Sequence, residues 1–236
     1  VYDNQEVDKK AQWEYFVNIE KLTKGVPLQH ITHTQEFMKM DFFVNENVLI
    51  PRQDTEIVVE EAIKIINENK LEKILDVCTG SGAIIISIAK YTKASNLVAI
   101  DISTKALEIA QKNAISNKVN NRIKFIQSNM FENIKEKYDL IISNPPYIKT
   151  AVIPNLDEEV KKEPIIALDG GDDGLNFYKI IAENAKRYLN TNGYLVLEIG
   201  YDQKEEVIKL LRINKYKDIQ CIKDFGNNDR VVICKI

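Results

Sequence analysis

Histidine and cysteine, the side chains that most often hold a metal in proteins, are scarce in this sequence. Its 236 residues include two histidines, His30 and His33, and three cysteines, Cys78, Cys221 and Cys234. The cysteine spacing matches no zinc or redox signature. We therefore expect no metal and three free thiols, and such thiols suit a reducing cytoplasm.

The sequence also lacks the marks of a membrane or secreted protein. No apolar run approaches the roughly 20 residues that a membrane-spanning helix needs, and the first residues are polar and acidic, unlike a signal peptide. An initiator Met is missing too, so we expect a chain shortened at its N-terminus.

A basic excess is absent as well. The 32 Lys and Arg residues face 35 Asp and Glu residues, for a net charge of −3. Proteins that mainly grip phosphate backbones usually carry a positive excess, so no direct nucleic-acid partner is expected. Glycine and proline, at 9 and 6 residues, are too few for long disordered or collagen-like stretches.

The first third of the chain shows two kinds of pattern. An approximate helical stripe of apolar side chains runs through residues 1–24, and the Gly-Val-Pro sequence at 25–27 predicts its end. Residues 36–50 alternate around Asn-Glu-Asn at 45–47, which indicates a β-hairpin. Apolar spacing over residues 57–66 then predicts another helix.

From residue 73 onward, strands and helices alternate. Strands are expected at residues 74–78, 97–100, 123–126, 138–143, 194–199, 219–221 and 231–235. Helices are expected at residues 83–91, 103–117, 176–189 and 203–214. This order predicts an α/β fold with a mainly parallel sheet and helices on both faces. The last two strands have no helix between them, so they should pair antiparallel.

A glycine loop at residues 76–82 follows the first of these strands. Gly80 and Gly82 allow a tight turn and let the backbone approach a ligand. Asp101 ends the next strand, where its carboxylate can accept both hydroxyls of a ribose, and Asp76 can reach an amino group of the ligand. Because the third glycine of a dinucleotide fingerprint is missing, the loop fits a nucleoside without a pyrophosphate, such as S-adenosylmethionine. The alternative is a plain turn between strand and helix.

The tetrapeptide Asn144-Pro145-Pro146-Tyr147 follows the fourth strand. Two prolines fix two φ angles and remove two N–H donors, which leaves a stiff loop presenting carbonyl oxygens. The Asn144 side-chain oxygen and the Pro145 carbonyl could each accept one N–H of a substrate NH₂ group and aim its lone pair at a sulfonium methyl carbon. The Tyr147 ring can cover a planar substrate group. The alternative is an ordinary rigid turn.

The chain resembles the peptide-chain release factor glutamine methyltransferases over about residues 20–236. The stretches that carry the resemblance are residues 25–31, 42–44, 48–56, 76–84, 101, 144–147, 163–164, 167–168, 170–175, 193–200, 203 and 229–232. The combination of Pro-Arg-x-x-Thr-Glu at 51–56 with Gly-Gly-x-Asp-Gly at 170–174 is specific. Gln53-Asp54 stands where the family usually has Pro-Glu.

The resemblance implies a Rossmann-like class I methyltransferase domain over residues 51–236, with a seven-stranded, mostly parallel sheet whose last strand is antiparallel. It also implies that residues 1–50 are the remnant of an N-terminal helical substrate-recognition region, here one helix, with a β-hairpin. The implied reaction moves a methyl group from S-adenosylmethionine to the glutamine of a Gly-Gly-Gln loop on class 1 release factors, which leaves S-adenosylhomocysteine.

The resemblance further implies a set of site residues. Those expected to contact the methyl donor are Asp76, Cys78, Thr79, Gly80, Ser81, Gly82, Asp101, Met130 and Asn144. Those expected to hold the glutamine are Asn144, Pro145, Pro146, Tyr147 and Arg52. Met130 stands where many members place an aromatic ring over the adenine, and a methionine can also cover a ring.

Alternatives remain open at this point. Thr55 and Glu56 fit a helix-capping box as well as a ligand contact, and residues 170–174 fit either a rigid turn or a loop covering the substrate. An adenine methyltransferase acting on nucleic acid shares the tetrapeptide, but it would need a basic approach to a flipped base. A third hypothesis is an inactive adaptor that only binds S-adenosylmethionine.

Overall fold

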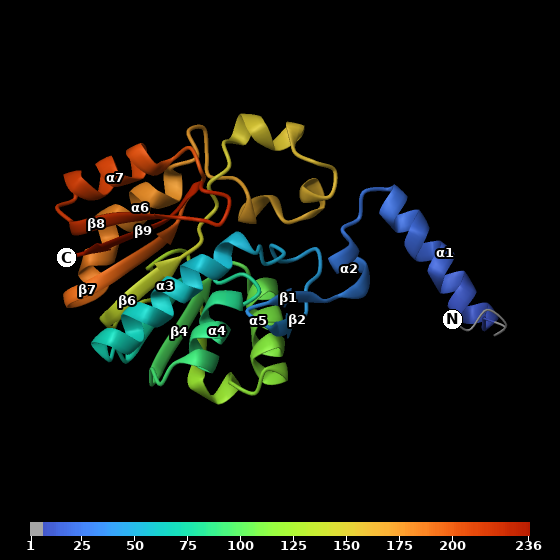
Figure 1. Cartoon of the computed structure of the whole chain (residues 1–236), viewed down its shortest axis with the longest axis horizontal. Coiled ribbons are helices and arrows are strands. Elements are labelled where there is room, and N and C mark those ends of the chain that lie inside the picture. Colours follow the sequence, from blue (N-terminus) through green and yellow to red (C-terminus); the bar gives the residue numbers. More distant parts are fainter. Residues whose placement is uncertain (1–6) are drawn as a thin grey trace.

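The computed structural model describes residues 7–236, and Figure 1 shows a large α/β body with one helix projecting from it. That helix, α1 (Lys9–Thr23), corresponds to the predicted N-terminal helix; the first six residues of that prediction lie outside the described part. A short helix, α2 (Leu28–Thr32), follows it, although the sequence pattern did not indicate one.

The main sheet has seven strands, as expected. They are β3 (Lys73–Val77), β4 (Asn96–Asp101), β5 (Ile123–Gln127), β6 (Tyr138–Ser143), β7 (Leu189–Glu198), β8 (Lys217–Lys223) and β9 (Asp229–Lys235). Their spatial order is β5-β4-β3-β6-β7-β9-β8. Neighbouring strands from β5 to β7 run parallel, whereas β9 pairs antiparallel with both β7 and β8. The predicted sheet, with its antiparallel last strand, is confirmed.

Five helices cover the two faces of this sheet (Figure 1). They are α3 (Asp54–Asn69), α4 (Ala83–Tyr91), α5 (Thr104–Ser116), α6 (Asn176–Asn184) and α7 (Lys204–Ile213). Strand side chains alternate between the faces, so Ile74 and Leu140 belong to the core under α3 and α4, while Leu75 and Ile141 belong to the core under α6 and α7. Two apolar layers therefore hold the sheet from both sides.

The hairpin exists, but its predicted turn is wrong. The strands are β1 (Gln35–Phe37) and β2 (Met40–Phe42), and the turn lies at Met38 and Lys39 instead of 45–47. Both turn residues have positive φ, +49° and +57°, as a two-residue hairpin turn of this type requires. Met and Lys are not the residues that usually form such a turn, so no pattern in the sequence predicts its position.

Two boundaries in the second half also differ from expectation. The helix predicted over 176–189 ends at Asn184 and continues as a 3₁₀ turn, Ala185–Tyr188. Strand β7 then begins at Leu189 rather than at 194. The pairing of β6 with β7 is irregular between Tyr138 and Leu140, and this early part of β7 is polar, which hid it from the alternating pattern.

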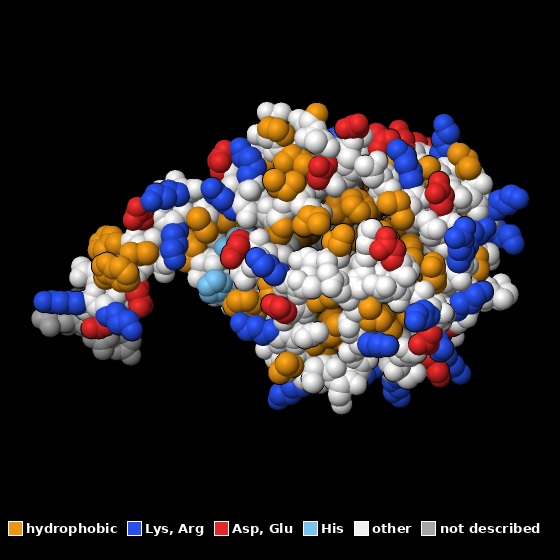
Figure 2. Space-filling model, turned by 180° about the vertical axis from the view of Figure 1, so that it is seen from behind, with side chains coloured by type: hydrophobic (Ala, Val, Ile, Leu, Met, Phe, Trp, Pro, Cys, Tyr) orange, Lys and Arg blue, Asp and Glu red, His pale blue; other side chains and the backbone are white. Residues whose placement is uncertain are grey.

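Helix α1 buries none of its side chains. Trp13, Tyr15 and Phe16 are more than 60% exposed, and Figure 2 shows hydrophobic side chains gathered on the projecting arm. The hairpin differs, because Phe37, Met40 and Phe42 are buried in the same core as α3 and α4. The proposed division of the chain at residue 50 stays a prediction.

Asn113, on α5, ties the segment after the hairpin to the glycine loop. Its side chain is fully buried. The Oδ1 atom accepts the Phe43 amide at 2.7 Å, and Nδ2 donates to the carbonyls of Phe43 at 3.0 Å and Ser81 at 2.9 Å. One side-chain amide therefore satisfies three backbone groups on two separate segments.

We expect Asn113→Ala to lower the free energy of unfolding by about 2–4 kcal/mol, because it leaves these backbone groups without partners. Denaturant unfolding followed by circular dichroism measures the loss. Asn184→Ala is the control, since the Asn184 side chain bonds only to Ile180 in its own helix and should cost less than about 1 kcal/mol. Equal losses in both variants would contradict the assigned role of Asn113.

Candidate active site

The site lies at the topological switch point of the sheet, where successive strands change from one side of β3 to the other. From β3 the sheet grows outward through β4 and β5, and the chain then returns to place β6 on the other side of β3. Ligands of open α/β sheets bind at this point, outside the carboxyl ends of the strands. Val77 pairs with Ser143, so the glycine loop and the Asn144 tetrapeptide leave the sheet side by side.

The glycine loop turns through left-handed backbone conformations at Cys78 (φ +61°), Gly80 (φ +54°) and Gly82 (φ +81°). A Cβ atom on Gly82 would lie 2.9 Å from Ile86 Cδ1 and 3.0 Å from Ala110 Cβ. Gly82 therefore lets α4 and α5 pack closely under the loop, while Gly80 keeps open space at its position. The plain-turn interpretation explains the glycines, but it does not explain the acidic groups around them.

Asp101 is fixed by two backbone amides. Its Oδ2 atom accepts the Gly80 N–H and its Oδ1 atom accepts the Ser103 N–H, both at 2.9 Å. Burial raises the pKa of Asp101, against the lowering effect of the Ser103 and Gly80 amides. Each carboxylate oxygen retains a lone pair, and the residue lines the cavity beside the loop, as the sequence predicts for a ribose acceptor.

Asp76 lies behind the loop rather than in the cavity wall. Its side chain is fully buried, Oδ2 accepts the Thr79 hydroxyl at 2.6 Å, and Oδ1 has no partner among the described residues. Burial raises the pKa of Asp76 to about 7, and the nearby charge of Asp101 raises it too. In this arrangement, Asp76 supports Thr79 through the hydrogen bond to its hydroxyl, and the expected contact of Asp76 with an amino group of the ligand stays a prediction.

A cavity opens above the ends of β3, β4 and β6. The predicted residues that line it are Cys78, Thr79, Gly80, Ser81, Asp101, Met130, Asn144 and Pro146. Five predicted residues lie outside its lining: Asp76, Gly82, Pro145, Tyr147 and Arg52. Eight residues separated by up to 68 positions in the sequence thus converge on one pocket.

Sequence reasoning missed most of the apolar wall. The lining residues that it did not single out as site residues include Asn47, Val48, Leu49, Ile102, Ser103, Ser128, Asn129, Pro164, Ile166, Ala167 and Phe177. They come from the segment before α3, the loops after β4 and β5, the 3₁₀ region near residue 165, and α6. All of them except Phe177 lie outside the α-helices and β-strands, and no sequence motif marks them.

The tetrapeptide is held from behind by residues 170–174. A Cβ on Gly170 would lie 2.7 Å from Tyr147 Cα, and one on Gly174 would lie 2.5 Å from the Tyr147 carbonyl oxygen. The Gln203 side chain donates to that same carbonyl at 2.9 Å. Residues 170–174 therefore form a turn that packs against the tetrapeptide and fixes its backbone, which favours the rigid-turn interpretation.

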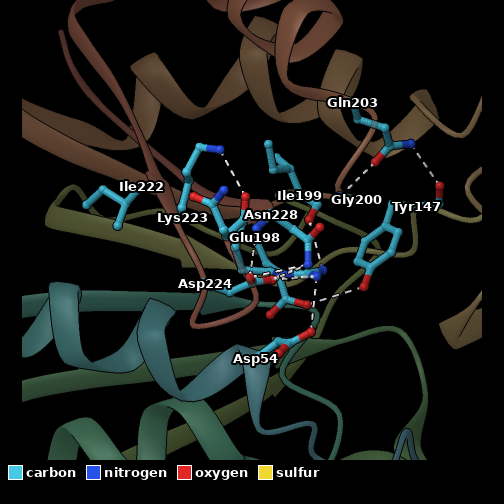
Figure 3. A network of polar contacts seen from close by, with 12 residues as sticks. Asp54, Tyr147, Glu198, Ile199, Gly200, Gln203, Ile222, Lys223, Asp224 and Asn228 are labelled. Atoms are coloured by element: carbon cyan, nitrogen blue, oxygen red, sulfur yellow. Dashed lines mark hydrogen bonds and ion pairs between the residues drawn. The ribbon is translucent and has the colours of Figure 1, made fainter.

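Tyr147 turns away from the cavity toward Glu198, as Figure 3 shows. Its hydroxyl donates to Glu198 Oε1 at 3.3 Å. Arg230 lies beside them and pairs with Asp224 and Asp54, each at 3.0 Å. Burial raises the pKa of Glu198 to about 7, opposed by the Thr55 hydroxyl and the Arg230 charge. The expected role of Tyr147 in covering the substrate stays a prediction.

Thr55 and Glu56 do not form the helix-capping box that the sequence left open. The helix begins at Asp54 with Gln53 as its N-cap, so Thr55 is not the cap, although Glu56 does lie in the first turn. Thr55 instead lines the cavity and accepts Asn144 Nδ2 at 3.3 Å. Arg52 forms an ion pair with the buried Glu163, away from the cavity lining.

Within residues 7–236, His, Cys, Asp and Glu side chains form no group of three or more that could hold a metal ion. The helices described there are also too short or too polar to cross a membrane.

Comparison with known proteins agrees with this geometry. Residues 55–171 match the Methyltransferase small domain family. The hMettl16 catalytic domain, solved with an RNA hairpin, superposes with a TM-score of 0.67 at 13% identity over 99% of this chain and 94% of that one. A methyltransferase from Pyrococcus furiosus gives 0.59 at 18% identity, covering 97% and 98%. The fold and site thus define a methyltransferase of the Rossmann-like class.

Two relatives in sequence share one specific activity in their names, unlike the structural neighbours. The release factor glutamine methyltransferase of Clostridium acetobutylicum is 42% identical over 97% of this chain and 81% of that protein. Its counterpart in Fusobacterium nucleatum is 45% identical over 98% of this chain and 65% of that protein, so the chain spans about two thirds of the latter. The chain belongs to the release factor glutamine methyltransferase family.

The buried Asp76 carboxyl predicts an unusual dependence of stability on pH. Because its pKa is higher in the folded chain than in the unfolded chain, its contribution to stability is present below about pH 4 and is lost as pH rises through about 7. Between these pH values, the free energy of unfolding of Asp76→Asn should rise relative to that of the wild type by on the order of 3 kcal/mol. Thermal and denaturant unfolding measure this difference.

Asp139→Asn is a control of opposite sign. Although burial would raise it, hydrogen bonds from the Lys73 amide and the Asn190 side chain hold the pKa of Asp139 below its ordinary value. This variant should therefore lose stability relative to the wild type as pH rises toward about 4, and the loss should stay constant above that value. A flat difference curve between Asp76→Asn and the wild type would show that Asp76 is not the buried acid described above.

Proposed function

We propose that this chain transfers a methyl group from S-adenosylmethionine to the side-chain amide nitrogen of a glutamine in the Gly-Gly-Gln loop of class 1 release factors. The observation that carries the proposal is Asn144, which faces a cavity also lined by the glycine loop and Asp101. A nucleoside site and an amide-binding side chain therefore share one pocket. A cytoplasmic setting, expected from the free thiols, belongs to the same proposal.

The donor half of the pocket suits S-adenosylmethionine. Asp101 supplies a carboxylate for the ribose hydroxyls, and the wall beside it carries Val48, Ile102 and Met130, which can enclose an adenine. Gly80 brings its backbone to the edge of the cavity. When bound, the sulfonium would supply an activated methyl carbon. The loop lacks the features of a pyrophosphate cradle, in keeping with a donor that has none.

The acceptor half must overcome the weak nucleophilicity of an amide nitrogen. Asn144 Oδ1 would accept one N–H of the substrate amide, and the Pro145 carbonyl, although Pro145 is not among the lining residues, would accept the other. The two acceptors would orient the nitrogen lone pair for in-line attack. The nitrogen–carbon bond would form as the sulfur–carbon bond of the donor breaks, the donor would leave as its neutral thioether, and the nitrogen would release its proton to water. The acceptors gain most as the nitrogen acquires positive charge, so they favour the transition state.

The choice of a release factor as substrate rests on the relatives and on charge. Proteins 40–45% identical over most of this chain carry the name release factor glutamine methyltransferase. The net charge of −3 gives no general attraction for a nucleic-acid backbone. An adenine acceptor remains the alternative, since an exocyclic NH₂ group presents the same two N–H donors.

Incubation with methyl-labelled S-adenosylmethionine and either a purified class 1 release factor or DNA tests this proposal. We expect label on the release factor, mapped by mass spectrometry to the glutamine of Gly-Gly-Gln. A release factor whose glutamine is changed to alanine is the matched control and should take up none. Label on DNA alone would favour the adenine enzyme, and label on neither would favour an adaptor.

Asn144→Ala should reduce single-turnover methylation by about 100-fold or more, because the amide loses an acceptor that matters most in the transition state. Asn144→Asp keeps an acceptor and should retain part of the activity. Circular dichroism checks that both variants fold. Wild-type rates in Asn144→Ala would remove the tetrapeptide from the mechanism.

Asp101→Ala should weaken S-adenosylmethionine binding by about 1.5–3 kcal/mol in a calorimetric titration, since hydrogen bonds to a charged acceptor are lost. Asp172→Ala is a control carboxylate outside the cavity lining and should bind normally. Unchanged affinity in Asp101→Ala would mean that the ribose lies elsewhere.

A further inference from the structure

The proposed chemistry leaves one problem unsolved, namely the orientation of the Asn144 side chain. An asparagine amide has an oxygen at one end and an NH₂ group at the other, and the two ends are nearly the same shape. Only the oxygen can accept a substrate N–H. Rotation of the amide by half a turn would present a donor to another donor, so something must fix the orientation.

Thr55 is placed to fix it. Its Oγ1 atom lies 3.3 Å from Asn144 Nδ2, and its side chain is 4% exposed at the first turn of α3. Hydrogen bonding within the described residues engages Nδ2 of Asn144 but not Oδ1, so the oxygen is left for a ligand in the cavity. A hydroxyl alone does not settle the matter, because it can donate as well as accept.

Glu198 removes that ambiguity. The Thr55 hydroxyl lies close enough to Glu198 to lower the pKa of its carboxyl, and the Tyr147 hydroxyl donates to Glu198 Oε1 at 3.3 Å. Glu198 Oε2 has no partner among the described residues, so it is an acceptor left for the Thr55 proton. Above about pH 7 the Glu198 carboxylate is ionised and can only accept. Once the single Thr55 proton is directed at Glu198, Oγ1 has only lone pairs to offer, and Asn144 must turn its NH₂ group toward it.

Burial of Glu198 destabilises the fold, and this cost supports a functional role for the residue. The residue is 1% exposed, and its Oε2 atom has no partner among the described residues. A buried carboxylate with an unpaired oxygen destabilises a fold, and such groups in native structures call for an explanation beyond packing. Arg230, Asp54 and Tyr178 lie close enough to influence its charge.

We propose that Glu198 and Thr55 are positioning residues that hold the Asn144 amide with its oxygen toward the acceptor pocket. The relay runs from the carboxylate to the hydroxyl and from the hydroxyl to the amide. It rests on the proposed function for its purpose, but the order of the Asn144 side chain can be measured without any methyl acceptor.

Nuclear magnetic resonance of ¹⁵N-labelled protein gives that direct measurement, with Asn144→Ala identifying the Asn144 side-chain signals. In the wild type, we expect an order parameter of about 0.8 for the Asn144 amide, close to that of rigid backbone. Thr55→Val keeps the shape but removes the hydroxyl, and the value should fall below about 0.6. Thr55→Ser restores the hydroxyl and should restore the order.

Thr92→Val is the matched control, because Thr92 is a similarly buried threonine outside the cavity lining. It should leave the Asn144 signals unchanged. Glu198→Gln keeps the size of the side chain but can donate to Thr55, so it should also loosen Asn144. An Asn144 amide that stays ordered in Thr55→Val overturns the relay, and one that stays ordered in Glu198→Gln overturns the part assigned to Glu198.

Kinetics give a second measurement on the release factor. Thr55→Val should lower kcat by about 10–100-fold, as expected for a misplaced acceptor, while KM for the release factor changes less than about threefold. A rise in KM with unchanged kcat would instead show ordinary substrate binding by Thr55 and overturn the relay. If the wild type methylates no release factor, the proposed substrate is wrong, and the order of Asn144 still decides the relay.

Discussion

The parallel pairing of β3 with β6 is the constraint on which the site depends. Val77 lies opposite Ser143, and the Ser143 hydroxyl donates to the Val77 carbonyl at 2.7 Å, at the last residue of each strand. The next residues on either side are Cys78 and Asn144. A shift of one residue in this register would turn the side chains of one strand to the opposite face and separate the two halves of the pocket.

Three buried or half-buried carboxyls, Asp76, Asp101 and Glu198, lie around this edge, and burial raises the pKa of each. The sheet needs none of them for its hydrogen bonds. Two retain an oxygen without a partner, Asp76 Oδ1 and Glu198 Oε2, within the part of the chain described. Stability is therefore given up where the cavity forms, as is common for sites that hold charge in place before a ligand arrives.

The sequence predicts the sheet, its helices and the strand ends well, because apolar alternation and loop glycines report local structure directly. It predicts Asp101 and Asn144 because each ends a strand of a parallel sheet. It fails at the hairpin turn, where Met38 and Lys39 adopt positive φ without glycine or asparagine. It also fails at Thr55, whose contact with Asn144 joins residues 89 positions apart. Only the folded chain brings such pairs together.

The structure separates what the tetrapeptide determines from what it does not. Its backbone is clamped by Gly170, Gly174 and Gln203, and its tyrosine is directed into the core toward Glu198. Of its side chains, those of Asn144 and Pro146 line the cavity. Such an arrangement fixes the position of an NH₂ group but not the molecule that bears it. Selection between a glutamine and an adenine must therefore come from parts of the chain outside the tetrapeptide, which explains why the motif alone leaves both acceptors open. The cavity wall offers such parts in residues 47–49, Pro164, Ile166 and Ala167.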